Sequence, residues 1–215
     1  MLKSFTFSPF YENTYVLADE ATEECIIFDP GCHSAAEESE LKGYLMEHNL
    51  APVRLLLTHA HLDHIFGCAF LHERYGLLPE VHRDELPLLE AAPRQAAMYG
   101  VAMRPAPMPE EYLRPGQVIA LGDIRLECLL TPGHSPGHIS FYNRAEGYVI
   151  SGDALFQGSI GRTDLPGGDL RTLLASIKRE LLALPDNTVV YSGHGPATTI
   201  GEERERNPFL QGGVV

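Results

Sequence analysis

The stretch Thr58-His59-Ala60-His61-Leu62-Asp63-His64 constrains this chain more than any other, because it places four metal-ligand side chains within six residues. It directly follows the apolar run 53–57. Three imidazoles and a carboxylate this close repel one another when charged and waste hydrogen bonds when buried. A divalent cation removes both problems, since it binds neutral imidazole nitrogen and ionised carboxylate oxygen, at roughly 2.0–2.2 Å for zinc.

Chance does not account for this pattern. With 10 His in 215 residues, H-x-H-x-D-H arises by chance in about one such chain in a thousand. His59 and His61 lie two apart in an extended segment that leaves a strand, so their side chains point to the same side. Asp63 and His64 would open a helix and point elsewhere. The spacing therefore predicts two neighbouring metal positions, not one.

Composition places the chain among ordinary globular proteins. Of its 215 residues, 44% are hydrophobic and 21% charged, and the length fits one domain over residues 1–215. No apolar stretch reaches the roughly eighteen residues that span a membrane, and the N-terminus lacks the pattern of a secretory signal. A net charge of −13 argues against nucleic acid as a partner. We therefore expect a cytoplasmic protein that binds neither membranes nor nucleic acid.

The four cysteines, Cys25, Cys32, Cys68 and Cys128, form no C-x-x-C pair and have no metal-binding spacing. We interpret Cys25 and Cys128 as small buried hydrophobic residues. A structural role is favoured for Cys32 and Cys68 as well, although they lie nearer the motif. Free thiols of this kind fit a reducing compartment.

Apolar periodicity predicts a similar order of elements in both halves of the chain. Ser34 and Asp169 are expected to cap helices, and Gly76 to end the helix that follows the motif. This order favours the α/β class, as an α/β/β/α sandwich in which two sheets pack face to face with helices outside. Strands are predicted at 5–7, 14–18, 25–28, 53–58, 80–82, 117–121, 124–130, 139–142, 148–151 and 188–191, and helices at 34–49, 65–75, 84–98, 170–184 and 200–206.

Three later ligand candidates share one local context. His134, Asp153 and His194 each follow an apolar strand and are flanked by glycine, which lets the backbone turn tightly and approach a ligand. Alone, a His in such a turn is more often a surface or capping residue. Together with residues 59–64 these three bring the inventory to five His and two Asp. That set suffices for two metal ions with a bridging carboxylate and open positions for water.

The T-H-x-H-x-D-H cluster, followed by single His, Asp and His residues on glycine-flanked turns, resembles the metallo-β-lactamase superfamily. Within it, the segments 152–156 (Gly-Asp-Ala-Leu-Phe) and 161–164 (Gly-Arg-Thr-Asp) resemble the glyoxalase II branch, the hydroxyacylglutathione hydrolases. The resemblance spans roughly residues 13–196, most of the chain. It implies the four-layer sandwich and a centre that holds two divalent ions, with zinc favoured and iron or manganese also compatible.

The resemblance also assigns roles to the candidate ligands. Asp29 matches an aspartate that orients a ligand imidazole in this superfamily; the alternative is a plain turn that ends its strand. Asp63 and Asp153 are the candidate catalytic carboxylates. The implied ligands are His59, His61 and His134 for the first metal, Asp63, His64 and His194 for the second, and Asp153 as the bridge between both.

By this resemblance, two divalent ions share a hydroxide whose pKa lies far below that of bulk water. That hydroxide attacks at neutral pH, and the chain has no G-x-S-x-G elbow that would indicate a serine nucleophile. A small-molecule thioester is an apt substrate, because a thiolate leaves without needing a proton. An amide would need a proton donor, for which Asp63 is the candidate.

The substrate side of the resemblance is less complete. The glyoxalase II branch uses a basic residue nine positions after its bridging aspartate to hold a glutathione carboxylate, and Arg162 matches it. Two tyrosines of that branch are replaced by Asp164 and Pro196. Only 21 residues follow His194, too few for the helical C-terminal domain of full-length glyoxalase II. We expect a short thioester hydrolase in which glutathione dependence is the weaker part of the assignment.

Other functions remain open as alternatives. Persulfide dioxygenases resemble the chain in the same cluster and in a G-R-T-D segment, and they use one iron held by two His and an Asp. The net charge and the lack of a basic stripe argue against a nuclease, and the missing secretory signal argues against a β-lactamase. A purely structural zinc site would be closed and often cysteine-rich, whereas this one offers seven nitrogen and oxygen ligands.

Overall fold

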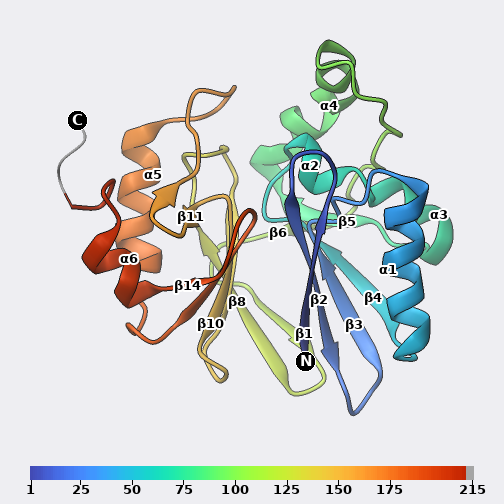
Figure 1. Cartoon of the computed structure of the whole chain (residues 1–215), viewed down its shortest axis with the longest axis horizontal. Coiled ribbons are helices and arrows are strands. Elements are labelled where there is room, and N and C mark those ends of the chain that lie inside the picture. The colour runs from blue at the N-terminus through green and yellow to red at the C-terminus, as the bar shows by residue number, and fades with distance from the viewer. Residues whose placement is uncertain (212–215) are drawn as a thin grey trace. The chain divides into compact units, whose positions relative to one another are not determined.

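In the computed structural model, which describes residues 1–211, the strands form two six-stranded sheets, one in each of two units. The first unit comprises Met1–Tyr112 and Ala120–Ile124, and the second comprises Leu113–Ile119 and the chain from Arg125 onward. Figure 1 draws the first unit mainly in blue to green and the second mainly in yellow to red. The boundaries between the units cross β6 (Tyr112–Leu113), β7 (Val118–Leu121) and β8 (Ile124–Leu130).

The sheet of the first unit has the order β1-β2-β3-β4-β5-β6. β1, β2 and β3 pair antiparallel, whereas β3, β4 and β5 pair parallel. Since β3 and β4 are parallel, the residues that follow them leave the sheet at the same edge. The elements are β1 Leu2–Phe7, β2 Glu12–Asp19, β3 Glu24–Phe28, α1 Ala35–Glu47, β4 Ala51–Leu56, α2 Leu62–Ile65, α3 Cys68–Tyr75, β5 Pro79–His82, the 3-10 turn η1 Arg83–Glu85 and α4 Leu86–Met98.

The helix α1 packs on the sheet of the first unit. Leu41 and Leu45 of α1 join Cys25 and Ile27 of β3 in one apolar core. The side chain of Ser34 accepts a hydrogen bond from the Glu37 backbone N–H, and the Glu37 side chain accepts one from the Ser34 backbone. This capping box starts α1 at the predicted residue. β2 and β3 are buried along nearly their whole length, as strands covered on both faces are.

The sheet of the second unit has the order β14-β13-β10-β9-β8-β7. β10 and β13 pair parallel, whereas β10 with β9, β9 with β8 and β13 with β14 pair antiparallel. The short strands β11 and β12 form a separate hairpin. The remaining elements are β9 Ile139–Asn143, β10 Tyr148–Gly152, β11 Leu155–Phe156, β12 Ser159–Ile160, α5 Leu170–Ser176, the π-helical turn η2 Ile177–Leu181, β13 Val189–Ser192, β14 Thr198–Thr199 and α6 Ile200–Arg206.

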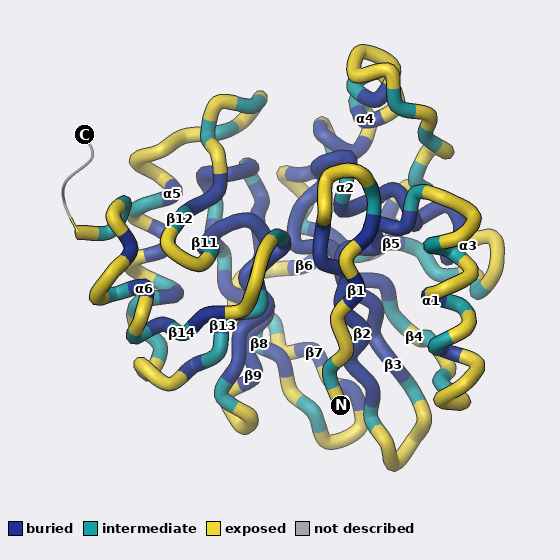
Figure 2. Tube along the Cα trace, in the orientation of Figure 1, coloured by how far each residue is buried: buried dark blue, intermediate teal, exposed yellow. Residues whose placement is uncertain are grey.

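One apolar core supports the second unit. Leu173 of α5 and Ile177 and Leu181 of η2 pack with Val149 of β10 and Val190 of β13. The strands of both units run mostly through buried residues, whereas the turns and the outer sides of the helices are exposed (Figure 2). The amphipathic pattern that predicts a helix at 170–184 therefore marks the side of α5 and η2 that faces the sheet.

The α/β class and the presence of two sheets with their helices are confirmed. The caps at Ser34 and Asp169 and the end at Gly76 lie where they were predicted. The helix expected from residue 65 begins at Cys68 because Ile65 ends the short helix α2. Five short elements were not predicted, since two or three residues carry no periodic pattern: β6, β11, β12, β14 and η1.

All four cysteines are buried and free of disulfide bonds, as predicted for Cys25 and Cys128. Burial raises the pKa of the Cys25 thiol to about 12, and that of Cys32 and Cys68 well above the usual range. These groups are therefore thiols at neutral pH, which is not the form that attacks a substrate or binds a metal. None of the helices in the described part of the chain is long and apolar enough to cross a membrane.

Glu37 ties the start of α1 to the turn between β1 and β2. Its carboxylate accepts hydrogen bonds from the backbone N–H groups of Ser8, His33 and Ser34, at 2.7, 2.9 and 2.8 Å. Partial burial alone would raise its pKa, but these donors outweigh burial and hold the pKa of Glu37 below its usual value. We expect Glu37→Gln to lower the free energy of unfolding at pH 7 by about 1 kcal/mol, given its partial exposure, in urea denaturation.

The pH dependence of this loss has a defined sign. A carboxyl group with a lowered folded-state pKa stabilises the fold above its unfolded pKa, near 4.3 for Glu, and this stabilisation disappears as the pH falls through the folded value. The difference between wild type and Glu37→Gln should therefore shrink below about pH 4. Glu40→Gln, exposed on the same helix, is the matched control and should change little. A difference that grows in acid would contradict this account.

Candidate metal centre

The first four candidate ligands lie where the chain leaves β4 and enters α2. His59 lies in the loop after β4, His61 is the N-cap residue of α2, and Asp63 and His64 belong to that helix. The ring centroid of His59 is 4.7 Å from that of His61 and 4.1 Å from that of His64, and all three residues are buried. Buried imidazoles this close repel one another when protonated, so the neutral form that binds metal is favoured.

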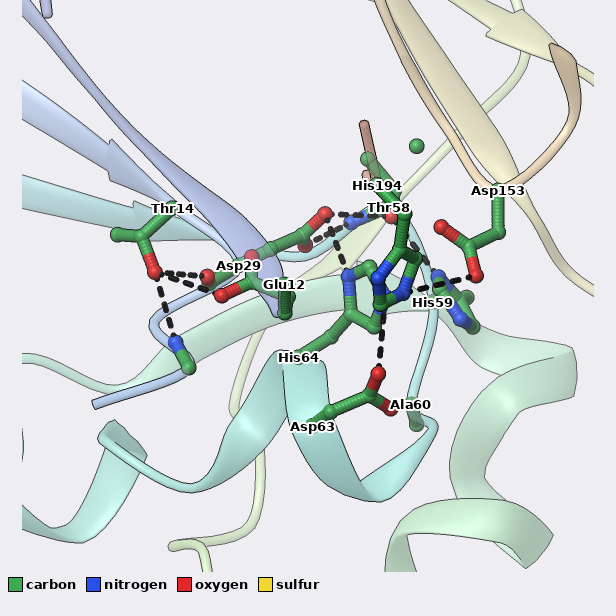
Figure 3. A network of polar contacts seen from close by, with 12 residues as sticks. Glu12, Thr14, Asp29, Thr58, His59, Ala60, Asp63, His64, Asp153 and His194 are labelled. Atoms are coloured by element: carbon green, nitrogen blue, oxygen red, sulfur yellow. Dashed lines mark hydrogen bonds and ion pairs between the residues drawn. The ribbon is translucent and has the colours of Figure 1, made fainter. Parts of the chain in front are cut away.

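The buried carboxylate of Asp29 lies close to Thr58 and His64 (Figure 3). Asp29 accepts from the backbone N–H of Thr58 through Oδ1 and from the Thr58 hydroxyl through Oδ2, each at 2.7 Å. Since Thr58 donates its only hydroxyl proton to Asp29, its oxygen accepts from Nδ1 of His59, 2.9 Å away. Nδ1 of His64 faces Asp29 Oδ2 at 3.1 Å. His59 therefore carries its proton on Nδ1, so its Nε2 is the unprotonated nitrogen.

This proton order decides how Asp29 is interpreted. Ligand atoms of Asp29, His59 and His64 lie within 4.8 Å of one another, a spacing that could hold an ion. The Nδ1 atoms on that side already interact with Thr58 and Asp29, so we interpret Asp29 as the group that orients the two rings. Its backbone has a φ of 45°, in the left-handed region that aspartate enters more readily than most residues other than glycine. The contacts of its carboxylate help to hold this conformation.

Asp63 lies on the other side of His64. Its Oδ2 atom is 4.0 Å from Nε2 of His64. The Asp63 side chain is 17% exposed, whereas that of His64 is fully buried. The first unit thus brings together all four candidate ligands of the motif, His59, His61, Asp63 and His64, with Asp63 as the member most open to solvent.

A second buried carboxyl group lies in β2, where the sequence analysis did not anticipate it. Glu12 is fully buried, and burial raises its pKa well above the usual value. The Thr14 hydroxyl has one proton but two acceptors within reach, Glu12 Oε2 at 2.9 Å and the Asp29 carbonyl at 2.8 Å. Both contacts are satisfied when Glu12 is protonated and donates to Thr14. A Cβ at Gly31 would lie 1.9 Å from Glu12 Oε2, so only glycine fits there.

In the second unit, one carboxylate oxygen lies between two imidazoles. Oδ2 of Asp153, which follows β10, is 3.5 Å from Nε2 of His134 and 3.5 Å from Nε2 of His194. Both distances are longer than a normal hydrogen bond. Two ligands at roughly 2.1 Å from one tetrahedral ion lie about 3.4 Å apart. Within this unit Oδ2 of Asp153 therefore lies at the distance from each nitrogen that two ligands of one ion have.

The orientation of His134 is also set by an oxygen that can only accept. Its Nδ1 lies 2.8 Å from the backbone carbonyl of Arg162, so Nδ1 carries the proton and Nε2 faces Asp153. This contact depends on Gly161. A Cβ there would lie 1.9 Å from the Asp153 carbonyl and 2.9 Å from Nδ1 of His134. The glycine of the G-R-T-D segment is thus needed for close packing around a ligand.

The side chain of Arg162 binds Asp164. Nε and Nη2 of the guanidinium each donate to one carboxylate oxygen at 2.8 Å, a bidentate pair. The hydrogen bond from Arg162 lowers the pKa of Asp164 to about 2, so this carboxylate is charged at neutral pH. Both side chains are largely exposed, 61% for Arg162 and 69% for Asp164. The cation expected to hold a substrate carboxylate therefore already has an anionic partner.

Sequence reasoning missed several groups that support the ligands. Thr58 stands beside His59 in the motif, and its position before the first His is a usable signal. Glu85 is buried, and its Oε2 accepts from the backbone N–H of Ala60, which separates the first two motif imidazoles. Glu12 was detectable only as a charged residue within an apolar strand. His138 accepts a hydrogen bond from the backbone N–H of Asp153.

Comparison with known proteins identifies the family of this chain. Residues 8–194 match the family model of the metallo-β-lactamase superfamily. The chain belongs to the metallo-β-lactamase superfamily. It is 42% identical to the probable metallo-hydrolase YqgX of Bacillus subtilis, over 95% of this chain and 94% of that protein. It is 38% identical to the hydroxyacylglutathione hydrolase GloC of Haemophilus influenzae, over 94% of this chain and 93% of that protein.

Solved structures of this superfamily agree in fold. The BLEG-1 B3 metallo-β-lactamase matches with a TM-score of 0.89 and 40% identity, covering 99% of this chain and all of that one. TTHA1623 in a di-iron-bound form matches with a TM-score of 0.85 and 41% identity, covering 97% and 100%. ETHE1 from Myxococcus xanthus is more distant, with a TM-score of 0.78 and 28% identity over 97% and 83%. Together with the His/Asp donor sets, these findings support a metal-dependent hydrolase.

The hydroxyl of Thr58 provides a direct test of the orientation described above. Thr58→Val keeps the shape of the side chain but removes the link between Asp29 and His59. We expect zinc affinity to fall about 10–100-fold, measured by competition with a chromogenic chelator, because His59 loses the acceptor that holds its ring. Thr22→Val, in an exposed turn, is the matched control and should bind like wild type. Unchanged affinity in a folded Thr58→Val protein would show that the hydroxyl does not orient the ring.

Proposed function

We propose that this protein hydrolyses thioesters at a centre of two divalent ions, with zinc as the first choice and iron or manganese as alternatives. The position of Asp153 carries the proposal, because one carboxylate oxygen lies 3.5 Å from the metal-facing nitrogens of both His134 and His194. In the proposed assignment, His59 and His61 join His134 at one ion, and Asp63 and His64 join His194 at the other.

The donor chemistry of the chain fits this assignment. The donors are imidazole nitrogens and carboxylate oxygens, which suit zinc, iron and manganese. His59 and His134 donate their Nδ1 protons to oxygen atoms, so Nε2 is the unprotonated ring nitrogen of each. The cysteine thiols are buried and do not compete.

When bound, divalent ions would lower the pKa of water and polarise a carbonyl group. The chain itself would orient these ions through ligands whose rings cannot turn, since their Nδ1 protons are held. Hydrolysis of a thioester adds the elements of water across the C–S bond and releases a carboxylate and a thiol. The sulfur leaves readily as a thiolate, so no side chain needs to donate a proton to it. A thioester therefore makes the smallest demand on the residues described here.

A GloC relative at 38% identity supports the choice of thioesters, since its name records hydroxyacylglutathione hydrolysis. Arg162 would then attract the anionic carrier of the thioester. Its bidentate pairing with Asp164 reduces that attraction. We therefore propose that the site accepts thioesters of more than one carrier, with glutathione as one candidate. The alternative is dioxygenase chemistry of the persulfide type at a single iron.

A substrate panel tests the reaction class. The zinc-, iron- and manganese-loaded proteins would be assayed with lactoylglutathione, an acyl-coenzyme A, an N-acetylcysteamine thioester and a chromogenic cephalosporin. We expect release of free thiol from at least one thioester with a kcat/KM about 100-fold above that for the cephalosporin. Preferred turnover of the cephalosporin would assign the protein as a β-lactamase instead. Sulfide-linked oxygen uptake by a protein with one iron would favour the dioxygenase.

Removal of the shared carboxylate tests the metal arrangement. We expect Asp153→Ala to lose metal from both positions, because its Oδ2 atom is near a ligand nitrogen of each. Elemental analysis after dialysis would measure metal per chain, with about two ions in wild type. Asp123→Ala, an exposed aspartate, is the control. Loss of one ion alone would show that Asp153 does not bridge.

The charge on Asp164 should tune substrate affinity. Asp164→Asn removes the anionic partner of Arg162, so it should lower the KM for lactoylglutathione by about 1.5–5-fold with kcat unchanged. Arg162→Ala should raise that KM with metal content retained. Neither variant should change the KM of the uncharged N-acetylcysteamine thioester. Equal changes for charged and uncharged thioesters would contradict a role of this pair in reading substrate charge.

A further inference from the structure

A buried chain of hydrogen bonds runs beneath Asp153 in the second unit. Nε2 of His138 lies 3.1 Å from the backbone nitrogen of Asp153, and its Nδ1 lies 2.8 Å from the hydroxyl of Thr131. That hydroxyl lies 2.9 Å from Oγ of Ser140, which lies 3.2 Å from the carbonyl of Ser151. His138, Thr131, Ser140 and Ser151 are all fully buried. This chain of hydrogen bonds therefore begins and ends on the same short segment of backbone, at the end of β10.

The two ends of this chain have fixed roles, so every proton within it has only one place. The Ser151 carbonyl can only accept, so Ser140 donates to it. Ser140 then has no proton left for Thr131, so the Thr131 hydroxyl donates to Ser140. Nδ1 of His138 must in turn donate to Thr131. At the other end the Asp153 N–H can only donate, and it needs a bare Nε2 on His138.

These hydrogen bonds are compatible with a single chemical form of His138. It is the neutral imidazole with its proton on Nδ1, since a proton on Nε2 would oppose the Asp153 N–H. The ring is perpendicular to that of His134, with centroids 6.1 Å apart. Its Nε2 therefore serves the backbone of a ligand residue and is not a ligand atom itself.

The hydrogen-bond chain holds the peptide groups on both sides of Gly152, the residue that turns the backbone toward Asp153. Gly152 has a φ of 52°, in the left-handed region that favours glycine. Its own carbonyl accepts from the N–H of Gly193 at 2.8 Å. With the Ser151 carbonyl and the Asp153 N–H also held, the peptide groups around this turn have little freedom to rotate. The direction in which the Asp153 carboxylate leaves the strand is thus determined by these hydrogen bonds.

We propose that His138 is a positioning residue for Asp153: as the neutral Nδ1–H form it closes a one-directional hydrogen-bond chain that fixes the carboxylate shared by the metal ligands. The inference rests on the proposed function only for the role of Asp153 at the ions. Its alternative is a core histidine whose removal lowers stability without changing metal binding. The two differ in the zinc affinity expected for His138→Gln and for Thr131→Val, since Thr131 does not touch Asp153 in this chain of contacts.

Nitrogen NMR of ¹⁵N-histidine-labelled protein tests the tautomer directly, without activity. We expect the His138 resonances, assigned by loss in His138→Gln, to show a protonated Nδ1 and a bare Nε2 in the metal-free protein and in the zinc-loaded protein. Thr131→Val, which removes the acceptor of Nδ1 while keeping its shape, should weaken this preference. A protonated Nε2 or a zinc-dependent shift typical of a ligand nitrogen would overturn the proposal.

Zinc affinity tests the positioning role. We expect His138→Leu to bind zinc about 10–100-fold more weakly than wild type, as expected when a group that orients a ligand is lost. His138→Gln, whose side-chain oxygen can accept from Asp153 while its NH₂ donates to Thr131, should recover most of that loss. His48→Leu, on the exposed end of α1, is the control. Thermal unfolding would compare the three variants, and if His138→Leu does not fold, Thr131→Val takes its place.

The outcomes separate this inference from the proposed function. If zinc binds equally well to wild type, Thr131→Val and His138→Gln, and to His138→Leu where it folds, the positioning role is wrong even when thioesters are hydrolysed. If wild type hydrolyses no thioester but His138→Leu or Thr131→Val loses zinc affinity and His138→Gln restores it, the positioning role stands and the substrate class is wrong. Equal losses in His138→Leu and His138→Gln would indicate a packing role and overturn the proposal.

Discussion

The hydrogen bonds between Asp29 and Thr58 are the contacts on which the first half of the donor set depends. A buried imidazole that binds a metal through one nitrogen must place its proton on the other, and that proton needs an acceptor. Asp29 accepts from the Thr58 hydroxyl, whose oxygen accepts from Nδ1 of His59, and Oδ2 of Asp29 lies 3.1 Å from Nδ1 of His64. Because a carboxylate cannot donate, His59 cannot reverse its tautomer without losing a buried hydrogen bond. The geometry of the ligands thus follows from one acceptor.

The second unit meets the same requirement with backbone atoms. The carbonyl of Arg162 receives Nδ1 of His134, and the chain through His138 ends on the carbonyl of Ser151. Carbonyl oxygens also accept only, so these protons are equally fixed. A backbone acceptor moves with its strand or turn, however, and needs a close approach to the ring. That is why Gly161, which has no Cβ to keep the segment away, precedes Arg162.

Much of this could be predicted from the sequence, because the signals are local. The motif at 58–64, the glycine-flanked turns around later ligands and the cap at Ser34 each lie within a few residues. Other features depend on contacts that form only after folding. Thr14 reaches the Asp29 carbonyl, fifteen residues away, because β2 and β3 pair. The chain from His138 to Ser151 likewise joins neighbouring strands, and a serine or threonine in a buried strand carries no sequence signal of its partner.

Residue 162 contributes both to the orientation of a candidate ligand and to a surface ion pair. Its carbonyl holds His134 and its guanidinium holds Asp164, so the same turn serves a ligand and a surface ion pair. The chain has a net charge of −13, which repels anionic substrates at a distance. A lone cation at the surface would offset that repulsion locally, but one paired with a carboxylate offsets much less. Under the proposed function, an anionic carrier that binds Arg162 would displace Asp164, an exchange of one carboxylate for another on the same guanidinium. Such an exchange gains little energy in itself, so the acyl thioester group, more than the charge of its carrier, would determine which substrates react.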